Sequence, residues 1–216
     1  MVKQLVILGD SFCHGIGTVT PFKNKENNKY AFGQYIADYY NLEYVNLAEP
    51  GISIPRTIEL GYQYLLKNST QVDKVIIGWT NTSRFGIYSD NSVLQILPEF
   101  IWLGDTSDDN VFVKHNNTIK FITNKQNEKY LKILPDLHRL MVENDFFNQE
   151  KNCYMYMNLF KTWLKDNNIL YYDFSVFGNV SDTQLTVSFQ QVMVPNRHPT
   201  IEEQKLLADL LLEQLP

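Results

Sequence analysis

Short apolar runs alternate with amphipathic stretches along the first third of the chain. The apolar runs are rich in β-branched residues, a pattern typical of strands buried in a parallel sheet. These strands are expected at 3–8, 43–47 and 73–79. Between them, residues 30–40 and 55–67 place apolar side chains at helical spacing, and Pro55 suits a first helical turn. This strand–helix–strand–helix–strand order predicts an α/β fold with a parallel sheet.

The same patterns return towards the end of the chain. Residues 149–167 have a helical pattern, and residues 169–174 form another short apolar run that predicts a strand. Thr200 precedes a final amphipathic stretch and forms a T-x-x-E capping box with Glu203, which predicts the start of a last helix. Three further segments are expected to be a loop at 18–29, a helix at 127–147, and a strand or extended loop at 184–194.

Residues 89–125 interrupt this alternation of strands and helices. The acidic turn GDTSDDN is followed by VFVKHNNTIKFIT, whose two alternating halves around Asn116 and Asn117 predict a hairpin. No repeat and no linker is visible in the sequence. The predicted organisation is therefore a single domain, 1–216, with an insertion at about 89–125. In such a domain, ligands bind at the carboxyl ends of the parallel strands.

Composition narrows the class of protein. A chain of 216 residues, 44% of them hydrophobic, suits one core, and its net charge of -5 gives no electrostatic footprint for nucleic acid or a membrane surface. The two cysteines, Cys13 and Cys153, form neither a CxxC pair nor a zinc spacing, which is typical of a reduced protein without metal. No stretch approaches the ~20 apolar residues of a membrane span, and none resembles a signal peptide. We expect a cytoplasmic protein made without export; if it works outside the cell, release by lysis or association with a virion is expected.

A serine stands directly after the first predicted strand, in the segment GDSFCHG at residues 9–15. A helix that starts at Ser11 leaves backbone N–H groups unpaired, and such groups can hold the negative oxygen of a tetrahedral intermediate. Asp10 can fix the turn by accepting hydrogen bonds from nearby N–H groups, and it is also a candidate substrate contact. The alternative interpretation is a Gly-Asp-Ser turn that only starts a helix.

The next two strand ends carry further candidates. Gly51 follows the second strand and suits either a turn with positive φ or a close approach of its N–H group to a ligand. Asn81 follows the third strand, where its amide can serve as an oxyanion donor or form a polar turn. Trp79 and Arg84 are candidate substrate contacts. The alternatives are a core position for Trp79 and a carboxylate partner for Arg84.

A histidine stands just before the final predicted helix, in the segment NRHPT at residues 196–200. At a junction between a loop and a helix, His198 can approach a serine at a strand end, take its proton and return that proton to the leaving group. The other histidines are His14, His115 and His138. His14 is so close to Ser11 in sequence that a short loop hinders the right geometry, and the other two are expected to be surface or packing residues.

Together these segments resemble the SGNH, or GDSL-like, hydrolase family, named for a serine, a glycine, an asparagine and a histidine in four separate blocks. The first block is similar to GDSFCHG here, with the nucleophile at Ser11. The glycine block is similar to the segment at Gly51, and the last block is similar to NRHPT, with His198 before a proline. The blocks occur in the family's order and span nearly the whole chain.

The sequence departs from this family in two places. The third block usually reads Gly-x-Asn-Asp, whereas Asn81 stands one place late here, so that Asn81 or Thr80 is the oxyanion donor or the donor is missing. The family's aspartate before the histidine is replaced by Asn196, which can orient the ring but supplies no charge. A similar replacement in a triad protease lowers turnover by ~10⁴. The alternatives are a Ser–His dyad, a carboxylate from elsewhere such as Asp182, slow turnover, or no activity.

The resemblance implies a three-layer α/β/α sandwich with a flavodoxin-like parallel sheet. It implies ester hydrolysis through an acyl-enzyme, without metal or cofactor, with Ser11 as nucleophile and His198 as base and then acid. The N–H groups of Ser11 and Gly51, with Asn81, would hold the oxyanion. The partner would be a small-molecule or carbohydrate ester, such as an O-acetyl sugar. The alternative hypotheses are a binding or structural protein that keeps this fold, and a nucleotide- or flavin-binding protein. The second is disfavoured by the absence of a Gly-rich phosphate loop.

Overall fold

The computed structural model describes residues 2–18, 25–82, 85–89, 92–96, 100–105, 111–114, 149–176, 180–187 and 198–216. The chain divides into two compact units. The first combines Met1–Asn81 with Tyr156–Pro216, and the second is Thr82–Met155. Each unit has its own four-stranded sheet. The second unit is wider than the insertion expected at 89–125.

The sheet of the first unit is parallel throughout. Its strands are β1 (Gln4–Leu8), β2 (Glu43–Asn46), β3 (Val72–Trp79) and β8 (Tyr171–Ser175). They are ordered β2-β1-β3-β8, and all three pairings are parallel. The chain thus steps outward from β1 to β2 and then returns past β1 to β3, which is the flavodoxin-like order. The four strands predicted at 3–8, 43–47, 73–79 and 169–174 are confirmed.

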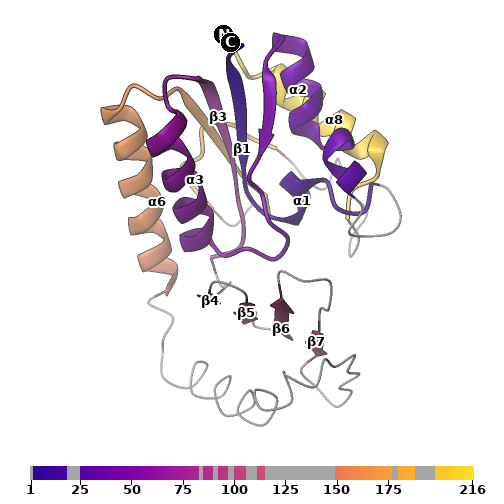
Figure 1. The fold of residues 1–216 in the computed structure, drawn as a ribbon, viewed down its shortest axis with the longest axis vertical. Coiled ribbons are helices and arrows are strands. Elements are labelled where there is room, and N and C mark those ends of the chain that lie inside the picture. The colour runs from indigo at the N-terminus through magenta and orange to yellow at the C-terminus, as the bar shows by residue number, and fades with distance from the viewer. Residues whose placement is uncertain are drawn as a thin grey trace. The chain divides into compact units, whose positions relative to one another are not determined.

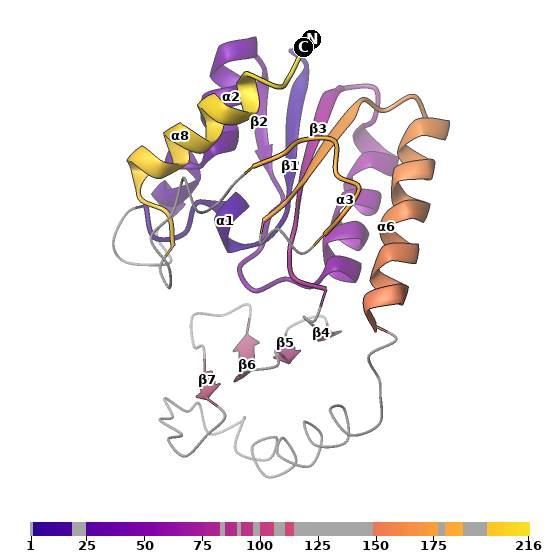
Figure 2. The same ribbon diagram turned by 180° about the vertical axis from the view of Figure 1, so that it is seen from behind.

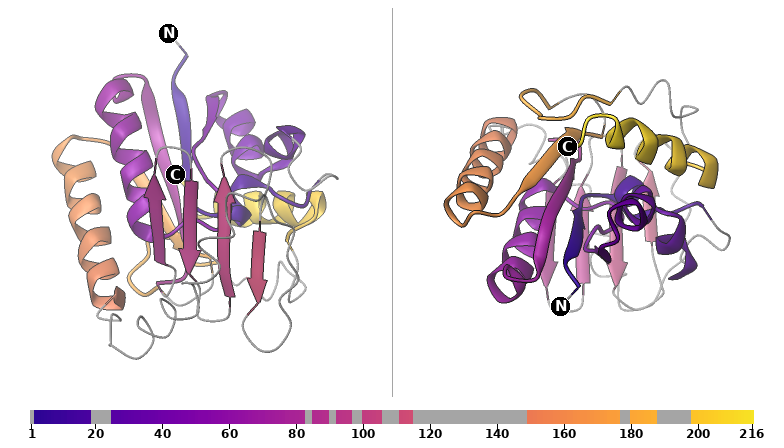
Figure 3. Two further views of the ribbon diagram at one scale, coloured as in Figure 1. Left: turned by 60° about the horizontal axis from the view of Figure 1, so that its bottom comes forward. Right: turned by 90° about the horizontal axis from the view of Figure 1, so that it is seen from above.

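Helices cover both faces of this sheet, which makes the first unit an α/β/α sandwich (Figure 1, Figure 3). One face carries α2 (Phe32–Tyr40) and α8 (Ile201–Leu212), and the other carries α3 (Ile54–Asn68) and α6 (Gln149–Asp166). Pro55 lies in the first turn of α3, and the Thr200–Glu203 capping box at the start of α8 is complete. The four helices predicted in these places are confirmed.

The core on the α2 and α8 side is built from alternate residues of the central strand. All five residues of β1 are buried, and Leu5 and Ile7 pack in one cluster with Ile36 of α2 and Leu207 of α8. A strand covered on both faces needs apolar side chains in both directions, which explains why β1 is a continuous apolar run rather than an alternating one.

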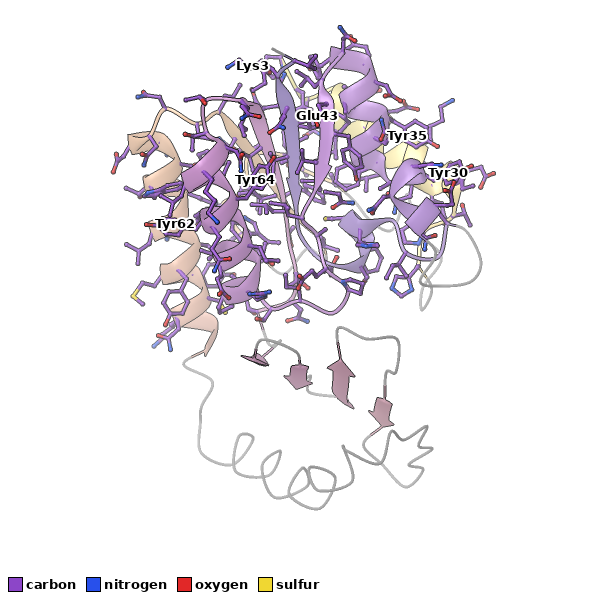
Figure 4. All side chains as sticks on the ribbon, in the orientation of Figure 1. Lys3, Tyr30, Tyr35, Glu43, Tyr62 and Tyr64 are labelled. Carbon is purple, nitrogen blue, oxygen red and sulfur yellow. The ribbon has the colours of Figure 1, made fainter. Side chains whose placement is uncertain are left out.

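Structural contacts hold the amino ends of the strands together. Tyr64 of α3 donates its hydroxyl to Gln4 Oε1 at 2.8 Å, and Gln4 Nε2 donates to Glu43 Oε2 at 3.0 Å (Figure 4). The C-terminus ends beside the same edge, where the Tyr40 hydroxyl donates to the Pro216 carbonyl at 2.7 Å (Figure 2). The opposite edge, at the carboxyl ends of the strands, carries the candidate chemistry.

The second unit contains an antiparallel meander. Its strands are β4 (Phe85–Ser89), β5 (Ser92–Ile96), β6 (Phe100–Asp105) and β7 (Val111–Lys114), paired in that order. The first half of the predicted hairpin is β7, which pairs with β6. Its second half and the predicted helix at 127–147 lie outside the described residues.

Two of the expected loops are described in part. The segment 18–29 contains a 3-10 helix, Lys25–Tyr30, within the expected loop. Of the segment 184–194, only residues 184–187 are described, and they form no strand. Among the helices that the structure describes, none is long and apolar enough to cross a membrane.

Candidate active site

Ser11 lies at the carboxyl end of the central strand β1. It is the first residue of a single helical turn, α1 (Ser11–His14), and its exposed fraction is 6%. Gly9 connects β1 to this turn with φ at +150°. A Cβ atom on Gly9 would overlap Cys13 Sγ and lie 2.8 Å from the Gly78 carbonyl oxygen, so only glycine fits here. The turn is therefore pressed directly against the end of β3.

Asp10 fixes this turn to the neighbouring strand. Its Oδ1 accepts from the Phe12 N–H group at 3.0 Å, and its Oδ2 accepts from the Thr80 hydroxyl at 3.0 Å. The turn-fixing role predicted for Asp10 is confirmed. Asp10 is fully buried and both its carboxyl oxygens are bonded, and the substrate contact also suggested for it stays a prediction. The Thr80 hydroxyl is engaged by Asp10, and which residue donates to the oxyanion stays a prediction.

Gly51 lies in a tight turn beside the same edge. The Ile52 N–H group bonds the Glu49 carbonyl at 3.3 Å, Pro50 precedes Gly51, and Gly51 has φ at +70°. These are the features of a type II turn, which requires glycine at its third position. The Glu49 N–H group donates to the Gly9 carbonyl at 3.1 Å, so the turn follows the chain that leads to Ser11. The turn expected at Gly51 is confirmed, and its role towards an oxyanion stays a prediction.

Trp79 lies in the core, the alternative position predicted from the sequence, and its role as a substrate contact stays a prediction. Its side chain has no exposed surface, and its indole N–H group donates to Asp173 Oδ2 at 2.7 Å. Asp173, in the middle of β8, is itself fully buried and forms an ion pair with Lys161 of α6 at 2.6 Å. Sequence reasoning missed this pair, although a charged residue inside an apolar strand and a lysine on an apolar helix stripe were visible signals.

The other candidates at the end of β3 are partly described. Asn81 follows Thr80 directly and is half-buried at the same sheet edge as Ser11. Arg84 lies outside the described residues, as does Asn196. Their predicted roles stay predictions.

His198 is brought from the other end of the sequence against the turn of Ser11. Its ring stacks at a tilt on Phe12, the residue after Ser11, with ring centroids 5.6 Å apart and planes at 35°. Gly17, just after α1, lies so close that a Cβ atom on it would be 2.7 Å from His198 Cβ. The structure therefore brings together the segments that carry Ser11 and His198.

Asp182 lies elsewhere. Its carbonyl accepts from Lys161 of α6 at 3.1 Å, and the residue is exposed. Figure 2 shows α6 and α8 on opposite faces of the sheet, and the predicted role of Asp182 towards His198 stays a prediction.

His14 is the second histidine near Ser11. Its Nδ1 atom is buried and has no hydrogen-bond partner among the residues that the structure describes. Burial lowers the pKa of its ring below the ordinary value of 6.5, so the ring is neutral at pH 7. A neutral imidazole without a partner can act as an acceptor, which makes His14 the residue against which the role of His198 must be tested.

The order of the strands explains why a ligand is expected to bind at the carboxyl ends of β1 and β3. The chain leaves β1 for β2 on one side of the sheet and leaves β3 for β8 on the other, so the loops after β1 and β3 separate at their carboxyl ends. In open α/β sheets, ligands bind at this topological switch point. Ser11 lies in the first of these loops, and Thr80 and Asn81 lie in the second. Within the described ranges, no group of three or more His, Cys, Asp or Glu side chains is arranged to hold a metal ion.

No protein-family model matches the sequence, and no curated protein sequence matches it. Several solved structures are similar over nearly the whole chain. A protein assigned to the lipolytic G-D-S-L family from Desulfitobacterium hafniense DCB-2 is 13% identical, covers 99% of each chain and has a TM-score of 0.37. Esterase EstA from Pseudoalteromonas sp. is 10% identical, covers 98% of this chain and 96% of its own, and has a TM-score of 0.39.

A third similar structure is a catalytic mutant of Axe2, an acetylxylan esterase from Geobacillus stearothermophilus. It is 12% identical, with 98% of this chain and 93% of its own covered and a TM-score of 0.40. At these identities and TM-scores the likenesses assign neither an activity nor a site residue to this chain.

Proposed function

We propose that this protein is a serine hydrolase that cleaves an ester through an acyl-enzyme, with Ser11 as nucleophile and His198 as base. The observation that carries the proposal is the convergence of these two residues' segments. Ser11 lies at the switch point of the sheet, and the His198 ring packs on Phe12, its direct neighbour in sequence. The fold of the first unit thus brings the segment of His198 against the turn that carries Ser11, which supports the proposal.

Each residue has a defined chemical task in this proposal. His198 takes the proton of the Ser11 hydroxyl as Ser11 Oγ attacks the carbonyl carbon. His198 then gives that proton to the departing alcohol, which leaves an acyl group on Ser11. A water molecule, deprotonated in turn by His198, attacks the acyl carbon. His198 then returns that proton to Ser11 Oγ as the acyl bond breaks, which releases the acid and free Ser11.

The oxyanion needs donors on the side of the carbonyl that faces the sheet. Because Asp10 takes the Phe12 N–H group, we assign the Ser11 N–H group of this turn to the oxyanion, together with the Gly51 N–H group and the Asn81 amide. A single such donor contributes about 3–4 kcal/mol to transition-state stabilisation in a comparable site. The small acyl group that we propose is acetyl, carried by a carbohydrate hydroxyl.

The first test is hydrolysis of p-nitrophenyl acetate by the purified protein. We expect Ser11→Ala and His198→Ala each to lower turnover by about 10³-fold or more, because each removes a reacting group. Ser69→Ala, at the exposed end of α3, is the matched serine control and is expected to change turnover less than about twofold. His14→Gln is the matched histidine control.

Two outcomes would overturn the proposal. The first is wild-type turnover no higher than that of Ser11→Ala, together with no labelling of Ser11 by a fluorophosphonate probe. The second is a loss of activity in His14→Gln but not in His198→Ala, which would move the base to His14. Acetate release from acetylated sugars, compared with p-nitrophenyl esters of longer acyl chains, tests the substrate class separately.

A binding protein of the same fold is the second candidate function. It is favoured by one observation, the commitment of the Thr80 hydroxyl to Asp10. This bond engages a hydroxyl that the sequence offered as an oxyanion donor. In this case, acetylated carbohydrate would bind equally well to the wild type and to Ser11→Ala, with no release of acetate.

A further inference from the structure

A buried glutamine joins the last helix to the turn that carries Ser11. Gln204 lies on α8 and has no exposed surface. Its Nε2 donates to the Phe12 carbonyl at 2.9 Å, and its Oε1 accepts from the Phe32 N–H group at 2.8 Å. Phe12 belongs to α1, and Phe32 is the first residue of α2, whose N-cap residue Ala31 offers no side-chain cap. One amide group therefore satisfies a carbonyl of α1 and an N–H group of α2.

The segment between Gln204 and His198 is stiff. The capping box fixes the start of α8 through two bonds, Glu203 N–H to Thr200 Oγ1 at 3.3 Å and Thr200 N–H to Glu203 Oε2 at 2.7 Å. Pro199, which is buried, restricts its own φ and the backbone of the residue before it. A displacement of α8 is therefore transmitted to His198 rather than absorbed between them.

The apolar contacts of α8 do not fix its register by themselves. Leu207, Ala208 and Leu211 of α8 pack in the core with residues of α2 and β1. Such contacts are non-directional, so they tolerate small displacements of a helix along its axis. The two hydrogen bonds of Gln204 are directional, and breaking either leaves a buried polar group unpaired.

We propose that Gln204 is a positioning residue, which holds His198 in register with Ser11 by tying α8 to the Phe12 carbonyl. The catalytic consequence rests on the proposed function of Ser11 and His198. The proposal itself concerns the placement of the His198 ring. It therefore predicts a change at His198 that can be measured whether or not the protein is active.

Two substitutions separate the bonds of Gln204. Gln204→Met keeps a similar length and volume but removes both bonds. Gln204→Glu keeps the acceptor for the Phe32 N–H group. At a pH at which its carboxyl group is ionised, it places a carboxylate oxygen against the Phe12 carbonyl and breaks the tie to α1 specifically, so it is assayed towards high pH. The matched control is Gln214→Met, just after α8. The Gln214 amide also bonds backbone groups, because its Oε1 accepts from the Thr186 N–H group and its Nε2 donates to the Thr186 and Leu210 carbonyls. It lies at the other end of the helix from His198.

The experiment measures hydrolysis of p-nitrophenyl acetate and the NMR signals of the His198 ring in the same proteins. His198→Gln identifies which of the histidine ring signals belongs to His198. In Gln204→Glu and Gln204→Met we expect kcat to fall about 10- to 100-fold with KM within about twofold, because a misplaced base affects the reaction more than binding. We also expect the His198 ring signals to shift or broaden while those of the control Gln214→Met stay in place.

The two readouts keep the two proposals apart. If the wild type neither turns over nor labels at Ser11 while the His198 signals still move in the Gln204 variants, the proposed function fails and the positioning role stands. If both Gln204 variants keep the wild-type kcat and His198 signals, the positioning role is overturned. A loss of folded protein in Gln204→Met, seen by circular dichroism, leaves Gln204→Glu to decide. Loss of thermal stability in either variant with kcat and the His198 signals unchanged assigns Gln204 a purely structural role and also overturns the proposal.

Discussion

The bond between Asp10 and Thr80 allows a quantitative test of how the turn of Ser11 is held. Thr80→Val removes the hydroxyl that donates to Asp10 Oδ2 at 3.0 Å but keeps the shape of the side chain. The side chains of both residues are almost fully buried, so water cannot easily replace the lost donor. The substitution therefore leaves a buried carboxyl oxygen with one partner fewer.

The matched control is Thr57→Val. Thr57 is equally buried, at 2% against 1% for Thr80, but its hydroxyl donates to the neutral carbonyl of Ser53 at 3.0 Å. A hydrogen bond to a charged group contributes about 1.5–3 kcal/mol to stability and one between neutral groups about 1 kcal/mol. We expect the free energy of unfolding to fall by about 2 kcal/mol in Thr80→Val and by about 1 kcal/mol in Thr57→Val. For a chain of this length, these losses lower Tm by about 4–8 °C and 2–4 °C.

The assay combines urea unfolding, followed by far-ultraviolet circular dichroism, with hydrogen exchange of the Phe12 amide. Exchange reports on the turn itself, because the Phe12 N–H group is bonded to Asp10 Oδ1. A local loss of about 1.4 kcal/mol accelerates exchange about tenfold. Equal losses of stability in the two variants, with unchanged exchange at Phe12, would refute the argument that Asp10 clamps the turn through Thr80.

Two further predictions concern groups buried elsewhere in the first unit. Lys161→Met leaves Asp173 buried without its cation and is expected to lower the free energy of unfolding by about 3 kcal/mol. The double variant Lys161→Met/Asp173→Asn is expected to regain much of that loss. A single variant as stable as the wild type in urea unfolding would contradict this prediction. The pKa of His14 lies below 6.5 in the folded protein, so as the pH falls the unfolded chain binds a proton at this residue before the folded chain does. The contribution of His14 to stability is therefore complete above pH 6.5 and decreases as the pH falls below that value. Tm measured from pH 7.5 to pH 5 should therefore fall less in His14→Gln than in the wild type, and parallel curves would show that His14 titrates normally.

Local patterns sufficed to predict the elements of the first unit, because each is encoded by its own residues. Strand β1 is apolar in both directions, and the Thr200–Glu203 box marks the start of α8 in four residues. The same holds for the turn at Gly51, where the Pro-Gly pair by itself favours the observed geometry. These features depend on neighbours in sequence and need no knowledge of the fold.

The contacts that position the side chains of the candidate site join residues distant in sequence, so local sequence patterns could not predict them. The sequence left Trp79 as a candidate substrate contact or a core residue, and in the structure its indole N–H group donates to Asp173, a residue of another strand. Thr80 stood next to the expected amide position, yet its hydroxyl faces Asp10 across two strands. Gln204 was one polar residue on an amphipathic helix, and nothing in its local pattern indicates that it reaches α1. Pairing of this kind follows from the order of the strands, which local patterns do not specify.

The core on the α2 and α8 face of the sheet has a consequence for how strand β1 is covered while the chain is being synthesised. Leu5 and Ile7 of the first strand form a core with Leu207 of the last helix. During synthesis, this face of β1 is therefore covered by α2 alone until α8 has been made. The segment of Ser11 precedes that of His198 in the chain, so a nascent chain acquires the α8 part of its hydrophobic cover and its candidate reactive pair together.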